Sequence, residues 1–202
     1  MIRLLLASAL LPLVAIAGPS EALSEGNALF AKRDWKQTAE FFARQDFREW
    51  PEKQRLEALR LKAVAETFAK MGAEAEATLR EAIRLQPMSA DWWLLLGDNY
   101  KLNFTDKAAE EMNAHQEALR LSGSGMGWQR FTAALAVARH HTDEVRGDDA
   151  LKVLQVFDAM PDVPPSWRVR LLHGQAHALA SLGRDAEAMA KFREALALEE
   201  KK

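Results

Sequence analysis

The stretch that decides the fold is Trp93-Leu94-Leu95-Leu96-Gly97-Asp98-Asn99-Tyr100. Its large residues Trp93, Leu96 and Tyr100 stand at positions i, i+3 and i+7, which places them on one face of an α-helix. Gly97 has no side chain, and this predicts that a second helix approaches the first one closely at that point. The stretch therefore predicts the first helix of a helical hairpin.

A second unit, near the C-terminal end of the sequence, supplies the other half of the pattern. Leu172, Ala176 and Leu179 share one helical face, and Gly183 is suited to end that helix. The helix that follows has small and apolar residues at intervals of four and three, namely Ala188, Phe192 and Ala195.

These two units resemble the tetratricopeptide repeat, whose first helix reads W-x-x-L-G-x-x-Y and whose second helix reads A-x-x-x-F-x-x-A. The small residue of the first helix recurs in this sequence at Gly26, Ala65, Gly97 and Ala176. The resemblance implies an all-α fold, an α-solenoid of about five helix-turn-helix repeats, over residues 20–200.

One repeat is expected in the long interval after Gly97, which is 79 residues from the next small residue. Residues 128–141 form an apolar-periodic segment, and residues 148–160 form a second one, so these are the two expected helices. The small residue of this fourth unit is expected near Ala136.

Residues 1–17 have the pattern of a signal peptide. Arg3 precedes an uncharged run from Leu4 to Ala17, which is too short to cross a bilayer. Ala15-Ile16-Ala17 matches the small-x-small pattern of a cleavage site. The sequence predicts a periplasmic or secreted superhelical domain at 18–202; the alternative is an uncleaved apolar N-terminus on a membrane-associated cytoplasmic protein.

Composition and motifs exclude several classes of function. Lys and Arg number 27 against 29 Asp and Glu, and this near-balance gives no reason to expect nucleic acid as a partner. Cysteine is absent, which excludes disulfides, thiol catalysis and Cys-ligated zinc. The sequence has no Gly-rich phosphate loop, no G-x-S-x-G and no H-E-x-x-H. We therefore expect a non-enzymatic protein without a cofactor.

Four histidines leave one chemical alternative open. His173 and His177 stand at i and i+4 of a helix, a spacing that can place two imidazoles on one metal ion. His140 and His141 end the first helix of the preceding repeat and could reach the same face. These residues form either a metal site, or a pH-responsive patch, or an ordinary set of polar helix residues.

The resemblance implies that a protein or peptide partner binds in the concave groove, where first helices present their inner faces. The corresponding positions here are Asn27, Lys62, Glu66, Asp98, Lys101, Arg170, His173 and His177. Tryptophan is enriched at interface hot spots, which makes Trp50 and Trp92 candidate anchors for such a partner.

Chain length, repeat number and the apolar N-terminus are also similar to those of bacterial kinesin-light-chain-like proteins. This second resemblance implies an adaptor that links tubulin-like filaments to a lipid membrane. The sequence thus leaves three candidate functions: an interaction scaffold outside the cytoplasm, a filament-associated adaptor, and a metal-binding protein.

Overall fold

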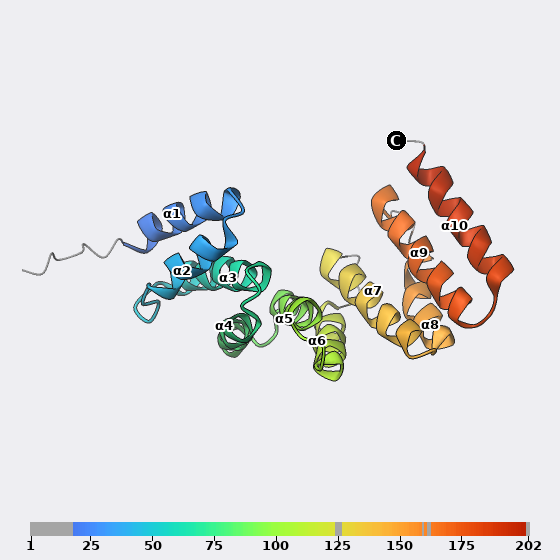
Figure 1. Ribbon diagram of the computed structural model, residues 1–202, viewed down its shortest axis with the longest axis horizontal. Helices are drawn as coiled ribbons and strands as arrows, with labels where there is room; N and C mark the ends of the chain where they lie inside the picture. Colours follow the sequence, from blue (N-terminus) through green and yellow to red (C-terminus); the bar gives the residue numbers. More distant parts are fainter. Residues whose placement is uncertain (1–17, 124–126, 159, 161–162, 201–202) are drawn as a thin grey trace, which may run out of the picture.

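The computed structural model describes residues 18–123, 127–158, 160 and 163–200, and these residues form helices and no strand. Ten helices follow one another: α1 (Pro19–Ala31), α2 (Trp35–Ala43), α3 (Glu52–Phe68), α4 (Gly72–Leu85), α5 (Ala90–Asn103), α6 (Ala108–Leu121), α7 (Trp128–Asp143), α8 (Gly147–Asp158), α9 (Pro165–Ser181) and α10 (Asp185–Glu199). Each odd-numbered helix packs against the helix that follows it, so the chain forms five hairpins in a row (Figure 1). The predicted all-α solenoid of five units is confirmed.

Neighbouring hairpins pack in two ways: the second helix of each unit packs on the first helix of the next, and successive first helices also contact each other. Helix α1 packs on α3, α3 on α5, α5 on α7, and α7 on α9. Within the described residues no second helix contacts the second helix of the next unit. A row of helices in mutual contact beside a splayed row produces curvature, with the first helices on the inner side. The array therefore has an inner surface made by α1, α3, α5, α7 and α9.

Four of the hairpins turn in the same way. Their turns are three residues long, and the middle residue has a positive φ: 57° at Arg33, 64° at Lys70, 60° at Val145 and 70° at Gly183. Only the last is glycine, so three side chains accept a conformation that L-residues rarely adopt. The turn between α5 and α6 differs, because it spans the four residues 104–107.

This shared turn fixes the register of the two units that the sequence places less clearly. Gly26 and Ala176 each lie seven residues before the positive-φ residue of their turn, and the equivalent residues are Ala63 and Ala138. Both alanines are buried, at 1% and 2% exposed. The register expected from Ala65 is therefore wrong by two residues, as is the expectation near Ala136 in the fourth unit.

Small residues permit the close helix contacts that the sequence predicts. A β-carbon at Gly26 would lie 2.1 Å from the ring of Phe42, and one at Gly97 would lie 2.4 Å from Nε2 of His115. Phe42 and His115 therefore occupy equivalent places, each in the second helix and directly against the small residue of the first. In the third unit an imidazole takes the place of an apolar side chain.

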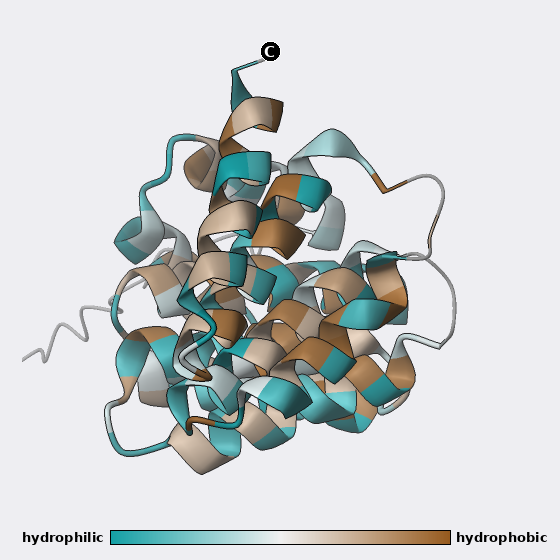
Figure 2. Ribbon diagram, turned by 90° about the vertical axis from the view of Figure 1, so that its right-hand side faces the viewer, coloured by the Kyte–Doolittle hydropathy of each residue, from teal (hydrophilic) through white to brown (hydrophobic). Residues whose placement is uncertain are grey.

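The core consists of two main clusters rather than one. Leu59, Leu79 and Leu96 belong to a cluster of α3 to α6, and Phe131 and Leu154 belong to one of α7 to α9. The helices nearest the viewer in Figure 2 show hydrophilic and hydrophobic residues in succession along their length, as expected for amphipathic helices in a stack. The junction between α6 and α7 lies between these two clusters and holds a smaller one made of Leu94, Ala118 and Ala133.

The proposed signal peptide at residues 1–17 lies outside the described residues, so its cleavage stays a prediction. Among the residues that the structure describes, no helix has both the length and the apolar character needed to cross a membrane.

Candidate functional site

The inner surface carries two neighbouring hollows, which lie across the first helices of the first three units. One hollow of about 560 Å³ lies between α1 and α3, and its lining includes Asn27, Gln54 and Glu57. A second hollow of about 230 Å³ lies between α3 and α5, and its lining includes Glu57, Arg60 and the indole of Trp92. Glu57 lines both hollows, so they lie next to each other on α3. We call this combined surface the inner groove.

Polar side chains in the inner groove are weakly tied to one another. The Asn27 amide donates to Oε1 of Glu57 at 3.5 Å, and Nε2 of Gln54 donates to the hydroxyl of Ser20 at 2.8 Å. Both contacts are exposed to solvent, and exposed hydrogen bonds contribute little net stability because water competes for them. These amides are therefore available to exchange their partners for the backbone of a bound peptide.

Another hollow lies on the opposite side of the array. It has a volume of about 620 Å³ between α4, α5 and α6, and Ile83, Trp93, Leu96 and Ala114 contribute apolar surface to it. Arg84 is exposed at its edge. Since α4 and α6 do not touch each other, α5 forms the floor of this hollow. We call it the outer groove.

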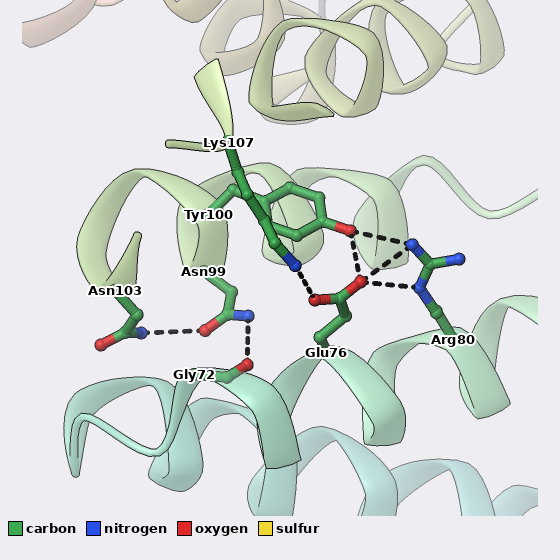
Figure 3. A network of polar contacts seen from close by, with 7 residues as sticks. All are labelled: Gly72, Glu76, Arg80, Asn99, Tyr100, Asn103 and Lys107. Carbon is green, nitrogen blue, oxygen red and sulfur yellow. Dashed lines mark hydrogen bonds and ion pairs between the residues drawn. The ribbon is translucent and has the colours of Figure 1, made fainter. Parts of the chain in front are cut away.

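One wall of the outer groove is held by a polar network around Glu76 of α4 (Figure 3). Its Oε1 accepts hydrogen bonds from the Tyr100 hydroxyl at 2.9 Å and from Nε of Arg80 at 3.0 Å. Its Oε2 accepts from Nζ of Lys107 at 2.5 Å. A second branch joins the same helices, because the Asn99 amide donates to the Gly72 carbonyl oxygen at 2.9 Å. The network thus fixes α5 and the start of α6 on α4.

The electrostatics of Glu76 follow from these contacts. Partial burial opposes its ionisation, but hydrogen bonds from Lys107, Tyr100 and Arg80 outweigh burial and lower the pKa of its carboxyl below the ordinary value. The hydrogen bond from Lys107 to Glu76 also raises the pKa of the Lys107 ammonium group. Glu76 is accordingly a carboxylate at neutral pH, with donors on both oxygens.

The structure spreads the predicted groove residues over different surroundings. Asn27 is exposed in the inner groove, Lys101 is exposed on α5, and the Asp98 side chain is half exposed beside His115. Arg170 is exposed on α9 and lies over the ring of Phe131, with its guanidinium carbon 5.5 Å from the ring centroid. Of this set, only Asn27 lines one of the two hollows of the inner groove.

Glu66 is not a groove surface residue. It is 2% exposed, and its Oε1 lies 3.6 Å from Nζ of Lys62, one turn earlier on α3. Burial raises the pKa of the Glu66 carboxyl, although the positive charge of Lys62 partly offsets this. The two-residue error in the register of α3 explains the misplacement, because it turns Glu66 from the core side to the inner face.

The two candidate tryptophan anchors are both packed into the protein. Trp92 is 5% exposed, lies in the cluster of α3 to α6, and donates its indole N–H to Oε1 of Gln86 at 3.3 Å. Trp93 is the more exposed of the adjacent pair. Trp50 is half-buried, with its ring 5.0 Å from that of Phe47. Trp92 is therefore a core residue whose edge alone reaches the inner groove.

The four histidines singled out in the sequence do not gather at one site. His173 and His177 are exposed, and each packs edge-on against the ring of Phe192 in α10. Nδ1 of His141 lies 2.6 Å from the guanidinium of Arg146, and burial together with Arg146 lowers its pKa. Of these four histidines, only His140 lies in a cluster of titratable side chains.

That cluster consists of Glu111, His115 and His140. One potential ligand atom from each residue lies within 4.8 Å of those of the other two, and all three residues are buried. Within the described part of the chain these residues form the sole group of three acidic or histidine side chains with such spacing. Burial lowers the pKa of His140, while the charge of Glu111 acts in the opposite direction.

Sequence reasoning missed Glu111 and His115, although the sequence contains a signal for them. The residues equivalent to Glu111 and His115 are Ala75 and Leu79 in α4, and Ala150 and Leu154 in α8. Glu111 and His115 have the same four-residue spacing but are polar. Two polar side chains at core positions of an otherwise regular repeat are the signal.

Comparison with protein-family models and with curated protein sequences gives no match. Solved structures do match the chain. MamA superposes with a TM-score of 0.68 at 19% identity, over 87% of this chain and 95% of that one. A putative kinesin light chain with nearly identical TPR-like repeats, from Podospora anserina, gives 0.71 at 17% identity over 90% and 95%.

YrrB, described as a TPR protein with an unusual peptide-binding site, gives a TM-score of 0.60 at 14% identity over 88% of this chain and 84% of that one. At these identities the similarity concerns the fold. Together with the repeated hairpins it shows that the chain is an α-solenoid of the tetratricopeptide-repeat type.

Proposed function

We propose that this protein is a non-catalytic interaction scaffold that binds an extended peptide segment of a partner protein in the inner groove. The observation that carries the proposal is the adjacency of two hollows that together span α1, α3 and α5, with Glu57 lining both. An extended segment has unpaired backbone amides and carbonyls along its length, and it fits a groove that crosses several helices.

The lining indicates the chemistry of the segment. Amide side chains of Asn27 and Gln54 can donate to and accept from a peptide backbone. Arg60 supplies a positive charge, while Glu57 and Asp91 supply negative ones. The segment that fits this lining is polar, carries charges of both signs, and places a small apolar side chain near the edge of Trp92.

The scaffold acts outside the cytoplasm in this proposal. Its support is the sequence of residues 1–17, where a short basic start, an uncharged run and a small-x-small pattern follow one another. The fold similarity to YrrB supports the peptide-binding half of the proposal, since that array of similar extent is described as holding a peptide-binding site. The filament-adaptor hypothesis rests on chain length, repeat number, the apolar N-terminus and similarity of fold.

Selection of displayed random peptides on the purified chain tests the peptide site. Enriched peptides should lose affinity at least tenfold when Gln54→Ala or Arg60→Ala is introduced, because both side chains line the inner groove. Arg84→Ala is the matched control, since Arg84 is exposed at the outer groove. Failure to enrich any peptide, or loss of binding in Arg84→Ala alone, contradicts the proposal.

A further inference from the structure

The buried cluster at the junction of α6 and α7 has the composition of a metal site without cysteine. Glu111 and His115 project from α6, one turn apart, and His140 projects from α7. Imidazole nitrogens and a carboxylate oxygen are a common donor set for Zn²⁺ in proteins. All three residues are 7% exposed or less.

The spacing of the donor atoms agrees with a tetrahedral ion. Zn–N and Zn–O bonds of about 2.0–2.2 Å place neighbouring ligand atoms about 3.4 Å apart. Nε2 of His140 lies 3.2 Å from Oε1 of Glu111, and Nδ1 of His115 lies 4.0 Å from the same oxygen. The three donor atoms lie within 4.8 Å of one another, so side-chain rotations that draw His115 closer are needed to bring them to one centre.

His115 is the independent observation that points to a ligand. Its side chain is 1% exposed, yet within the described part of the chain neither ring nitrogen has a hydrogen-bond partner. A buried polar group without a partner costs about 1–3 kcal/mol, and the equivalent position in other units is filled by leucine or phenylalanine at no such cost. A bound cation at Nδ1 would satisfy this ring.

The other nitrogen of His115 has the surroundings that metal-binding histidines have. Nε2 faces Oδ1 of Asp98 at 3.6 Å, just beyond hydrogen-bond distance. A carboxylate that accepts from the second nitrogen orients the ring and makes it a better ligand. Gly97 leaves room for this arrangement, since a β-carbon there would overlap Nε2. The side chain of Asp98 is itself half exposed to solvent.

Arg139 is the group that competes with a cation. Its guanidinium donates to Oε1 of Glu111 and also lies 3.3 Å from Oδ2 of Asp143. Without metal, Arg139 neutralises the buried carboxylate of Glu111. When a cation takes Oε1, Arg139 still has Asp143 as a partner, so the exchange leaves no unpaired guanidinium.

We propose that Glu111, His115 and His140 bind one Zn²⁺ ion, with Asp98 orienting His115 and a water molecule or a partner residue as the fourth ligand. The ion would join α6 of the third unit to α7 of the fourth, at the junction between the two main core clusters. It would therefore add a metal link across this junction, beside the apolar contact of Leu94, Ala118 and Ala133. This proposal does not depend on the peptide site in the inner groove.

Isothermal titration of the metal-free chain with ZnCl₂ tests the proposal. We expect one ion per chain, at least a tenfold loss of affinity in His140→Gln, and no binding of Mg²⁺, which prefers oxygen donors. His141→Gln is the matched control, because His141 is adjacent in sequence and pairs with Arg146 instead. Arg139→Gln should tighten binding, since it removes the competing cation.

His115→Leu keeps the test valid if polar substitutions unfold the protein. Leucine stands at the equivalent position of the second and fourth units, so this variant should fold and yet lose Zn²⁺ binding. Circular dichroism confirms the fold, and Co²⁺ absorption in the visible range reports tetrahedral coordination in the parent chain alone. No Zn²⁺ binding by the parent chain, or binding that His115→Leu and His140→Gln both retain, overturns the proposal.

Discussion

The imidazole of His115 lies directly against Gly97, so close that a β-carbon on residue 97 would stand 2.4 Å from Nε2 and 2.6 Å from Cδ2. The two residues belong to successive helices of one hairpin, α5 and α6. Their contact explains why the most regular first-helix pattern in the sequence contains glycine where helix propensity alone would favour alanine.

Gly97→Ala should destabilise the protein by about 1–3 kcal/mol, because the rigid ring of His115 has to move from a packed position. Urea unfolding followed by circular dichroism measures the change. Gly174→Ala is the control, since a β-carbon there meets only the flexible end of Leu154 at 3.0 Å and of Leu135 at 3.3 Å. Equal stability changes in both variants would contradict the conclusion that the contact with His115 requires glycine at position 97.

Glu76→Gln should destabilise the protein by about 1–2 kcal/mol at pH 7, since it removes a carboxylate that accepts from Tyr100 and Lys107. The folded state lowers the pKa of Glu76, so this contribution is present above the unfolded pKa of about 4.3 and disappears as the pH falls through the folded value. The difference in unfolding free energy between the parent and Glu76→Gln should therefore shrink below about pH 4.

Urea unfolding at pH 7 and at several acidic values provides the measurement for Glu76. Glu74→Gln is the matched control, because Glu74 is exposed on the same helix. A difference between parent and Glu76→Gln that stays constant from neutral to acidic pH would contradict the assignment of the effect to the carboxylate.

Glu66→Gln should have the opposite pH dependence. Burial raises the pKa of Glu66, so the folded state holds this proton more tightly, and stability falls as the pH rises from about 4.3 through the folded value. The variant lacks this fall, and its stability relative to the parent should improve toward neutral pH. Parallel curves of unfolding free energy against pH for parent and variant over pH 4–8 would be incompatible with a buried carboxyl whose pKa is raised.

The chain expressed with its own N-terminus in a bacterium with two membranes should be exported and begin at Gly18. Intact-mass measurement of the periplasmic fraction reads the cleavage point directly. Ala15→Arg should block processing, because a signal peptidase site requires a small residue there. An intact Met1 on membrane-associated protein would favour the cytoplasmic alternative.

Local patterns in the sequence determined the hairpins. The spacing of Trp93, Leu96 and Tyr100 specifies a helix with one apolar face, and the small residues Gly26 and Gly97 specify close contacts with the helix that follows. Both kinds of information lie within one helix or one turn. For this reason the five units, including the weak fourth one, could be predicted from the sequence.

The register of the second and fourth units was decided by turn geometry. Lys70 and Val145 adopt a positive φ without being glycine, so nothing in the residue type marks the turn. The resulting register error of two residues placed Glu66 in the expected groove, although this residue lies in the core. The core position of Trp92 likewise depends on tertiary packing, because its indole lies in the cluster of α3 to α6 and donates to Gln86.

Stacking of the units was needed to bring Glu111, His115 and His140 together. Glu111 and His115 are polar at two positions where the repeat places apolar residues, and this much stands in the sequence. His140 is 25 residues further along the chain and reaches them only because α7 packs on α6. Helix periodicity relates residues within one helix, whereas a site shared by two helices depends on how their faces meet.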